Sequence, residues 1–403
     1  MEIAFITSGL APGQDGVGDY TRDLAAACIQ RGHSCRIIGL NDRGVLDTVR
    51  QEQTARGVRV DALRIAATTS WPQRLQRTLE FLEWGSVEWV SLQFVPYGYD
   101  RKGLIGAFGA RLAPVVAGRR LQLMFHELWI GAEQGASLPH RLIGFAQRRA
   151  IIAMVESLAP SAIHTSNETY RALLREQGVQ STLLPLCGSI PVVSPPDGRW
   201  LEIEARRVGV APAPHRSWWF GLFGSLHPVW SPEPLFSHLA EAAQRSGRHV
   251  VIASIGRQGP GEELWRELEV RYSGRFTFVK FGECSPRDVS LFLQGIDFGI
   301  ATTPWSLIGK SATVAAMLEH GLPVIVSRDD VHFGCEKRWP SETEPLHQPL
   351  LYKMDSNLPE WLVRGAVRGT ARDGLDARAE QFLADMTRFP LPSNCNSRRF
   401  KLT

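Results

Sequence analysis

Short apolar runs alternate with amphipathic segments along the first half of the chain. The runs have the length of buried strands, and the segments between them repeat their apolar residues with helical spacing. The predicted strands are Ile3–Thr7, Cys35–Leu40, Val87–Phe94, Leu121–Phe125, Ala162–Thr165 and Thr182–Leu186. The predicted helices are Gly18–Arg31, Trp71–Trp84, Leu104–Ala117, Pro139–Leu158 and Asn167–Glu176. Alternation of this kind predicts a parallel sheet with helices on both faces.

A segment rich in proline and glycine, residues 187–214, interrupts this alternation. Such a density of turn residues indicates a linker or hinge. We therefore expect an N-terminal domain over residues 1–190, a linker over 191–215, a second domain over 216–375 and a tail over 376–403.

The alternation starts again after the linker. The predicted strands of the second half are Trp218–Phe223, Val250–Ile255, Phe276–Lys280, Phe298–Ala301 and Val324–Val326. The predicted helices are Leu235–Ala243, Glu262–Tyr272, Pro286–Leu293, Ser311–His320 and, near the end, Leu358–Met386. The pattern predicts an α/β protein with two tandem Rossmann-like parallel-sheet domains and a C-terminal helical tail. Ligands of such sheets bind beyond the carboxyl ends of the strands, and two facing domains predict a cleft as the site.

Composition narrows the function classes. The 403 residues are 44% hydrophobic and 21% charged, as in soluble globular proteins, and the net charge of +4 gives no case for nucleic-acid binding. No apolar run is long enough to span a bilayer, and the N-terminus has the pattern of a buried strand and not of a signal peptide. The six cysteines are scattered without a C-x-x-C motif, which favours reduced thiols in a cytoplasmic protein.

An anion site is predicted where the helix beginning near Ser311 follows Gly309 and Lys310. Free N–H groups at a helix start, next to a lysine, attract phosphate. The segment is not a P-loop, because Pro304 stands where that motif requires glycine. The alternative is a turn at Gly309, a solvated Lys310 and an ordinary N-cap at Ser311.

Small, polar or charged residues follow four predicted strands of the second half. Because the carboxyl ends of parallel strands lie at one edge of a sheet, these residues predict a nucleotide-sized ligand there. Each glycine taken alone could equally belong to a turn. The candidates are Gly224, Ser225, His227, Arg257, Glu283 and Thr302.

The loop after the first strand, residues 10–21, contains Gly13, Gly16 and Gly18, which would let the backbone approach a ligand. Their spacing is not the G-x-G-x-x-G dinucleotide fingerprint. Asp42, after the second strand, could still imitate the ribose-binding acid of a nicotinamide enzyme, so an NAD(P)-dependent oxidoreductase stays open. A flexible surface loop is the alternative.

His126 and Glu127 follow the predicted strand Leu121–Phe125. A histidine at the end of a central strand can bind substrate or act as acid or base near neutral pH. The alternative is a structural histidine bonded to a neighbouring loop.

Taken in order, these features resemble the GT-B glycosyltransferases, in particular the retaining enzymes of family 4. The resemblance rests on the tandem domains, Gly16-Val17-Gly18-Asp19-Tyr20, Arg31-Gly32-His33, the His126-Glu127 pair and the helix that enters Gly321-Leu322-Pro323-Val324. It implies that the second domain binds a UDP- or GDP-hexose with its diphosphate near Ser311 and Ala312. It also implies that no metal and no separate cofactor are needed.

The resemblance assigns the first domain to the acceptor. It implies that Gly16 and Gly18 approach the diphosphate or sugar, that His126 contacts the donor sugar near its anomeric carbon, and that Asp19 and Glu127 lie on the acceptor side. A glycan or lipid-linked sugar is the acceptor class that it implies.

The chain departs from the family pattern at three points. The Glu-x7-Glu pair is absent, because Ala316 stands at the second position and Glu319 lies on another face of the helix. The family's Arg and Lys after the first strand of the second domain correspond to Ser225 and Trp230. Lys310, with Arg257 and His227, is the candidate replacement for those cations.

The predicted activity is the retaining transfer of a hexose from a nucleoside diphosphate sugar, with UDP expected, to a glycan or glycolipid, as in polysaccharide synthesis. A nucleotide-sugar-binding protein without catalysis is the main alternative. The basic, apolar segment 140–149 also suggests contact with the cytoplasmic face of a membrane, although a helix packed on the sheet explains the same pattern.

Overall fold

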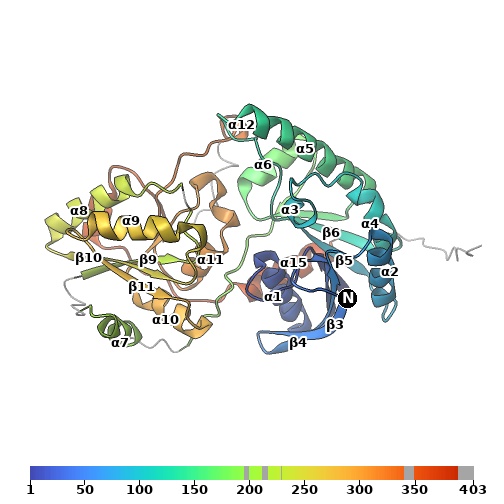
Figure 1. The fold of residues 1–403 in the computed structure, drawn as a ribbon, viewed down its shortest axis with the longest axis horizontal. Coiled ribbons are helices and arrows are strands. Elements are labelled where there is room, and N and C mark those ends of the chain that lie inside the picture. The colour runs from blue at the N-terminus through green and yellow to red at the C-terminus, as the bar shows by residue number, and fades with distance from the viewer. Residues whose placement is uncertain (195–198, 211–216, 228, 340–348, 389–403) are drawn as a thin grey trace, which may run out of the picture. The chain divides into compact units, whose positions relative to one another are not determined.

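Two separate β-sheets organise the chain in the computed structural model, which describes residues 1–194, 199–210, 217–227, 229–339 and 349–388. The first unit comprises residues 1–166, 173–184 and the C-terminal segment from Leu375, and the second comprises residues 167–172 and 185–374. Figure 1 labels helices and strands of both units.

The first unit has an eight-stranded sheet of order β3-β4-β2-β1-β5-β6-β7-β8. Its strands are β1 (Glu2–Thr7), β2 (Ser34–Asp42), β3 (Val49–Ala55), β4 (Val58–Ala66), β5 (Trp89–Phe94), β6 (Arg120–Phe125), β7 (Ala162–Thr165) and β8 (Thr182–Leu183). The helices are α1 (Gly16–Gln30), α2 (Trp71–Leu82), α3 (Pro96–Tyr99), α4 (Phe108–Val116), α5 (Leu138–Leu158), α6 (Glu168–Glu176, which begins in the second unit) and α15 (Leu375–Thr387). The central strands are buried on both faces, as expected for parallel strands covered by helices.

The prediction of a purely parallel sheet in the first domain is wrong at one edge. Strands β3 and β4 form an antiparallel hairpin that the sequence pattern did not reveal. The turn between them places both Arg56 (φ 50°) and Gly57 (φ 77°) in the left-handed region, the conformation of a tight hairpin turn. Arginine rarely adopts it, so the Arg-Gly pair gave only a weak turn signal.

The second unit has a six-stranded sheet of order β11-β10-β9-β12-β13-β14, parallel throughout. Its strands are β9 (Ser217–Phe223), β10 (His249–Ile255), β11 (Thr277–Gly282), β12 (Phe298–Ala301), β13 (Val324–Val326) and β14 (Leu351–Lys353). The helical elements are α7 (Trp200–Arg207), α8 (Glu233–Ser246), η1 (Gly259–Gly261), α9 (Glu262–Tyr272), α10 (Pro286–Gly295), η2 (Trp305–Lys310), α11 (Ala312–Glu319), α12 (Gly334–Arg338) and α14 (Leu358–Arg364).

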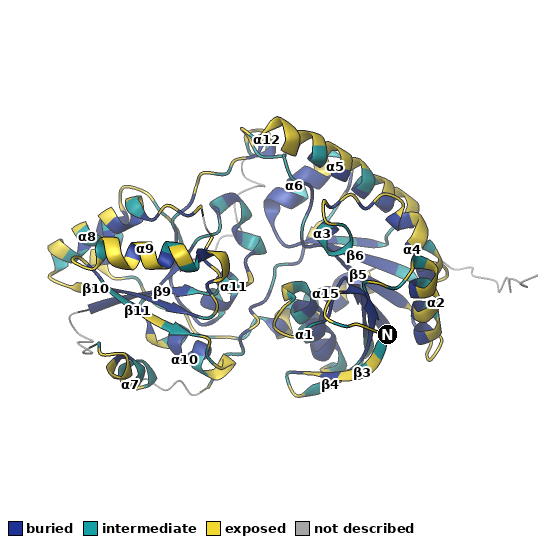
Figure 2. Cartoon of the chain, viewed as in Figure 1, coloured by how far each residue is buried: buried dark blue, intermediate teal, exposed yellow. Residues whose placement is uncertain are grey.

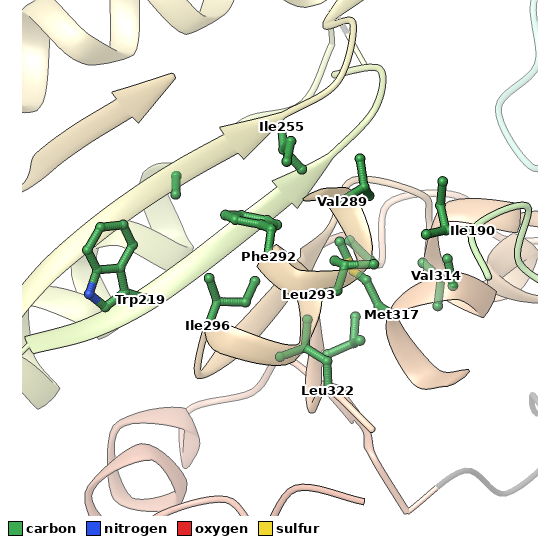
Figure 3. Packing of buried hydrophobic residues seen from close by; sticks show 14 of the residues in the cluster. Ile190, Trp219, Ile255, Val289, Phe292, Leu293, Ile296, Val314, Met317 and Leu322 are labelled. Atoms are coloured by element: carbon green, nitrogen blue, oxygen red, sulfur yellow. The ribbon is translucent and has the colours of Figure 1, made fainter. Parts of the chain in front are cut away.

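The core under one face of the second sheet holds helices α10 and α11 in place. Phe292 and Met317, from these two helices, pack in one cluster with residues of the strands, as Figure 3 shows. Both side chains are at most 1% exposed to solvent. Burial of side chains of this size stabilises the fold by about 1.5–3 kcal/mol each, so the start of α11 is held on a rigid base.

Two boundaries differ from the predicted ones. The predicted linker, residues 191–215, contains helix α7, whose Trp200 lies 5.8 Å from the ring of Phe281 and belongs to the second unit. The predicted continuous helix Leu358–Met386 is two helices, because Gly365 takes φ 83° and ends α14. The second of them, α15, belongs to the first unit, where Phe382 stacks on Phe5 with ring centroids 5.6 Å apart.

Candidate functional site

Strand ends of the second unit meet as the sequence predicted. The N–H of Gly224 donates to the carbonyl of Ile255, and the N–H of Gly256 donates to that of Gly282. Gly224 and Gly256 have φ of 75° and 90°. A Cβ added at Gly256 would lie 3.4 Å from the Gly224 backbone, and one added at Gly224 would lie 3.2 Å from the methyl group of Thr313. The backbone at this edge is therefore tightly packed and positioned against the start of α11.

The start of α11 lies where the sequence placed it. Ser311 is the N-cap, and its Oγ accepts a hydrogen bond from the N–H of Val314 at 3.3 Å. Ala312 is exposed. Within the described part of the chain, the N–H groups of Ala312 and Thr313 have no acceptor. Such N–H groups, together with the helix dipole, favour an anion.

Cationic side chains lie close to this helix start. The Nζ of Lys310 is 3.5 Å from the hydroxyl of Tyr170 and 5.9 Å from the centroid of its ring, within the second unit. Burial, together with the charges of Arg328 and Lys310, lowers the pKa of His227. The positive charges of Arg328 and Lys310 therefore both act on His227, one of the predicted residues.

Arg328 was missed by the sequence analysis. Its side chain forms a two-pronged pair with Asp330, at 2.9 and 2.7 Å, and its Nη1 donates to the carbonyl of Thr302 at 3.3 Å. Arg328 is 8% exposed. It lies two residues after β13, so the strand-end rule that selected the other candidates would have found it as well.

The remaining second-unit candidates fall into two groups. Arg257 and Glu283 follow neighbouring strands and form an ion pair, but both side chains are more than half exposed. Ser225 is also exposed, whereas Thr302 is half-buried. Trp230, at the position of the family's lysine, is buried, and its indole N–H donates to the Oγ of Ser327 at 3.0 Å. It cannot replace a cation.

In the first unit His126 lies directly after β6 and is 7% exposed. Its Nε2 lies 2.8 Å from Oε1 of Gln93, and the ring of Tyr20 meets it edge-on with centroids 5.1 Å apart. Burial lowers the pKa of His126 to about 3. The imidazole is therefore neutral at physiological pH and can accept a hydrogen bond. Glu127, beside it, is half-buried.

The glycine loop of the first unit is ordered by carboxylates. Asp15 caps α1 and accepts hydrogen bonds from the N–H groups of Val17 and Gly18, both at 3.0 Å. A Cβ on Gly18 would lie 2.5 Å from the carbonyl oxygen of Gly9, so close packing explains this glycine. Gly16 differs, because no atom lies within 4 Å of an added Cβ.

Asp19 also holds this loop. Its carboxylate accepts hydrogen bonds from the N–H of Gly13 at 3.1 Å and pairs with Arg22 at 2.7 Å. Asp19 is therefore a structural partner of the loop in this conformation, and its assignment to the acceptor stays a prediction.

Asp42 bears on the oxidoreductase alternative. The side chain of Asp42 is 1% exposed. Its carboxylate forms an ion pair with two nitrogens of Arg64, at 2.7 and 3.0 Å, and accepts a hydrogen bond from the N–H of Leu10 at 2.9 Å. Burial alone would raise the pKa of Asp42, but these hydrogen bonds outweigh it and hold the pKa below its usual value. A carboxylate satisfied in this way is not presented to a ribose.

The helix that suggested membrane contact, α5, exposes an apolar stripe. Leu138, Leu142 and Phe145 are 67%, 63% and 51% exposed and share one helical face. Arg148 and Arg149 lie over the ring of Phe145 at 5.5 and 6.0 Å. Figure 2 shows α5 exposed along this side.

None of the helices that the structure describes is long and apolar enough to cross a membrane. Within the same described ranges, no group of three or more His, Cys, Asp or Glu side chains could hold a metal ion.

Comparison with known proteins agrees with this fold. Residues 15–187 match the family described as Glycosyl transferase 4-like domain. No curated protein sequence matches the chain.

Several solved structures share the architecture over the whole length. Anabaena HepE in complex with UDP is 12% identical, with a TM-score of 0.54 over 96% of this chain and 92% of its own. HepE has also been solved with UDP-glucose. The catalytic domain of starch synthase IV from Arabidopsis thaliana, bound to ADP and acarbose, is 11% identical, with a TM-score of 0.57 over 96% and 99%. A glycosyltransferase from Rickettsia africae is 12% identical, with a TM-score of 0.51 over 97% and 94%. The predicted GT-B fold is confirmed.

Proposed function

We propose that this protein is a glycosyltransferase that moves a hexose from a nucleoside diphosphate sugar, with UDP as the expected nucleotide, to a hydroxyl group of a glycan or glycolipid. The observation that carries the proposal is the start of α11 in the second unit, where the N–H groups of Ala312 and Thr313 follow closely after Lys310 in the chain. The family match of residues 15–187 supports the reaction class. The UDP, UDP-glucose and ADP bound by proteins of the same fold support the donor class.

The second unit would stabilise the leaving group. When the bond between the anomeric carbon and the phosphate oxygen breaks, negative charge grows on the diphosphate. The N–H groups of Ala312 and Thr313 and the cation of Lys310 are fixed donors for that charge, and fixed donors need no reorganisation during the reaction. We include the buried Arg328 as a further cation of the site, whose charge Asp330 balances in this conformation.

The proposed stereochemistry is retention. The acceptor oxygen forms its bond on the face from which the diphosphate leaves, and the acceptor proton passes to a departing phosphate oxygen. This route requires no carboxylate pair flanking the sugar, in contrast to a double displacement.

His126 would bind the sugar and not transfer a proton. With its pKa lowered to about 3, the imidazole is a poor base at neutral pH but a good hydrogen-bond acceptor for a sugar hydroxyl. We assign Gly16, with open space around it, to close approach of substrate, and leave Gly18 with its packing role.

We also propose that the acceptor is carried at an anionic membrane surface. The stripe of Leu138, Leu142 and Phe145, flanked by Arg141, Arg148 and Arg149, combines apolar side chains with positive charge. A surface of this kind binds anionic lipid from the interface plane.

A ligand panel followed by turnover tests the proposed function. Thermal unfolding is measured with UDP, GDP, ADP, UDP-glucose and NAD, because a ligand that binds the folded state raises the midpoint. We expect a rise with a nucleoside diphosphate and its sugar and none with NAD. Release of nucleoside diphosphate that depends on an added acceptor then separates a transferase from a binding protein. A rise with NAD alone would refute the proposal.

A further inference from the structure

A continuous chain of buried polar side chains links His126 to helix α15. From His126 Nε2 it runs 2.8 Å to Gln93, 2.7 Å to Ser91, 2.6 Å to Gln122, 3.0 Å to His164 and 3.1 Å to Asp385. Every member is at most 7% exposed. We call these six residues the relay. All of them belong to the first unit.

The sheet register brings the relay together. Ser91 of β5 lies opposite Gln122 of β6, and His164 of β7 lies opposite Met124, two residues further along β6. Ser91 and Gln93 point to the same face of the sheet, because they are two residues apart on one strand. Asp385 comes to the relay from α15, which packs beside α1 in Figure 1. Residues far apart in sequence thus form one line of hydrogen bonds.

The carboxylate at the far end fixes the direction of every bond. Asp385 can only accept, so the Nε2 of His164 carries the proton. The amide nitrogen of Gln122 lies 3.0 Å from the other ring nitrogen, Nδ1, and donates to it when His164 is neutral, the form that burial favours by lowering its pKa. The amide oxygen of Gln122 must then face Ser91 and accept from its hydroxyl.

The directions of the remaining hydrogen bonds, toward His126, follow from the donor role of Ser91. Since the hydroxyl of Ser91 donates to Gln122, its oxygen accepts from the NH₂ of Gln93. The amide oxygen of Gln93 is therefore turned toward His126, and the Nε2 of His126 must donate to it. The other ring nitrogen, Nδ1, is left as the acceptor.

We propose that Asp385 is a positioning residue, which acts through this relay to hold His126 in the tautomer that carries its proton on Nε2. The consequence is a site that accepts a hydrogen bond at Nδ1 and does not offer one. A ligand that presents a hydroxyl proton fits this nitrogen, and a ligand that presents only an acceptor does not. The catalytic consequence rests on the proposed function, whereas the tautomer does not.

A purely structural role predicts a different result. A buried polar network costs free energy unless each group is satisfied, so any break in it should lower stability. Only a relay also changes the protonated nitrogen of a ring several side chains away. The readout must therefore be the tautomer itself.

The test uses the full chain labelled with ¹⁵N-histidine. Long-range proton–nitrogen spectra distinguish the protonated from the unprotonated nitrogen of a neutral imidazole, and the signal lost in His126→Gln identifies His126. We expect wild type to carry the proton on Nε2. In Asp385→Leu, which removes the acceptor, and in Ser91→Ala, which interrupts the relay, we expect the Nδ1–H tautomer to appear. The control is Asp376→Asn, which changes an exposed carboxylate of the same helix.

The possible outcomes separate the relay from the proposed function. A wild-type His126 protonated on Nδ1 overturns the relay, as does an unchanged tautomer in a folded Asp385→Leu or Ser91→Ala protein. Ser91→Ala and wild type keep the test decisive if Asp385→Leu does not fold. If the tautomer shifts as expected, loss of one neutral hydrogen bond should reduce kcat/KM for sugar transfer roughly fivefold. A shift in tautomer without transferase activity in wild type leaves the relay standing and refutes the proposed function.

Discussion

Gly188 lies directly against Ala316, so that a Cβ added at Gly188 would be 2.6 Å from the Cα of Ala316. The N–H of Gly188 also donates to Oε1 of Glu319 at 3.0 Å. Ala316 itself is fully buried. The position at which the family pattern has its second glutamate is therefore covered by the chain in this protein, and Glu319 holds that covering segment in place.

This packing predicts that the family glutamate cannot be restored. Ala316→Glu would bury a carboxylate with no space for it and should cost at least about 3 kcal/mol of unfolding free energy. Gly188→Ala should cost about 1–3 kcal/mol by overpacking. Denaturant unfolding measures both. Gly274→Ala is the control, because no atom lies within 4 Å of a Cβ there. Equal stability of Gly188→Ala and Gly274→Ala would contradict the packing.

Lys310 is predicted to bind the diphosphate. Lys310→Met keeps the aliphatic stem but removes the charge, and a hydrogen bond to a charged group contributes about 1.5–3 kcal/mol. We expect the affinity for UDP, measured by calorimetry, to fall about 10-fold or more. Arg328→Met should act in the same direction.

Lys280→Met is the matched control for Lys310→Met. Lys280 is on β11 and pairs with Glu262 at the surface, where an ion pair contributes little. Its loss should leave UDP affinity unchanged. The role given to Lys310 fails if wild type binds UDP and Lys310→Met binds it equally well.

Burial of His126 predicts a pH dependence of stability. Its pKa falls from 6.5 to about 3 on folding, so between these values the unfolded chain binds more protons than the folded one. The contribution of His126 to the free energy of unfolding should therefore be fully present above pH 6.5. It should decrease as the pH falls toward 3, by up to about 1.4 kcal/mol per pH unit. His126→Gln should show a shallower loss between pH 7 and 5 in denaturant titrations.

Other buried histidines add to the same slope, since burial also lowers the pKa of His164 and His320. The comparison is therefore between slopes. His140→Gln, which changes an exposed residue of α5, serves as the control. Identical slopes for wild type and His126→Gln would show that His126 is not buried as a neutral ring.

The exposed stripe of α5 predicts binding to anionic vesicles. Replacement of Leu142 and Phe145 by Glu removes two apolar side chains and adds negative charge. Each such side chain contributes about 1.5–3 kcal/mol when buried, so the double variant should lose sedimentation with phosphatidylglycerol vesicles. Val270→Glu is the control, because Val270 is an 80% exposed apolar residue elsewhere. Wild type that does not sediment with these vesicles contradicts the membrane proposal.

Local sequence pattern was sufficient to predict much of the fold and to select candidate residues for the site. The period of the apolar residues located the strands of both sheets except β3, β4 and β14, and the strand-end rule led to the candidates Gly224, His227 and His126. Ser311 was recognised as the start of a helix because N-capping depends on only a few neighbouring residues. The sequence pattern did not predict the edge hairpin of β3 and β4, because its turn holds Arg56 in a backbone conformation that arginine rarely adopts.

The sequence by itself therefore determined the α/β class, the two sheets and the glycine- and lysine-bearing loops, since these follow from local spacing of apolar residues and turn formers. Only the tertiary structure decided that Asp42 is paired with Arg64, that Arg328 is buried and paired with Asp330, and that Asp385 is linked to His126 through four intervening side chains. The physical reason is that hydrogen bonds and burial depend on which residues meet in space. No local pattern relates a carboxylate in the last described helix to an imidazole at the end of β6.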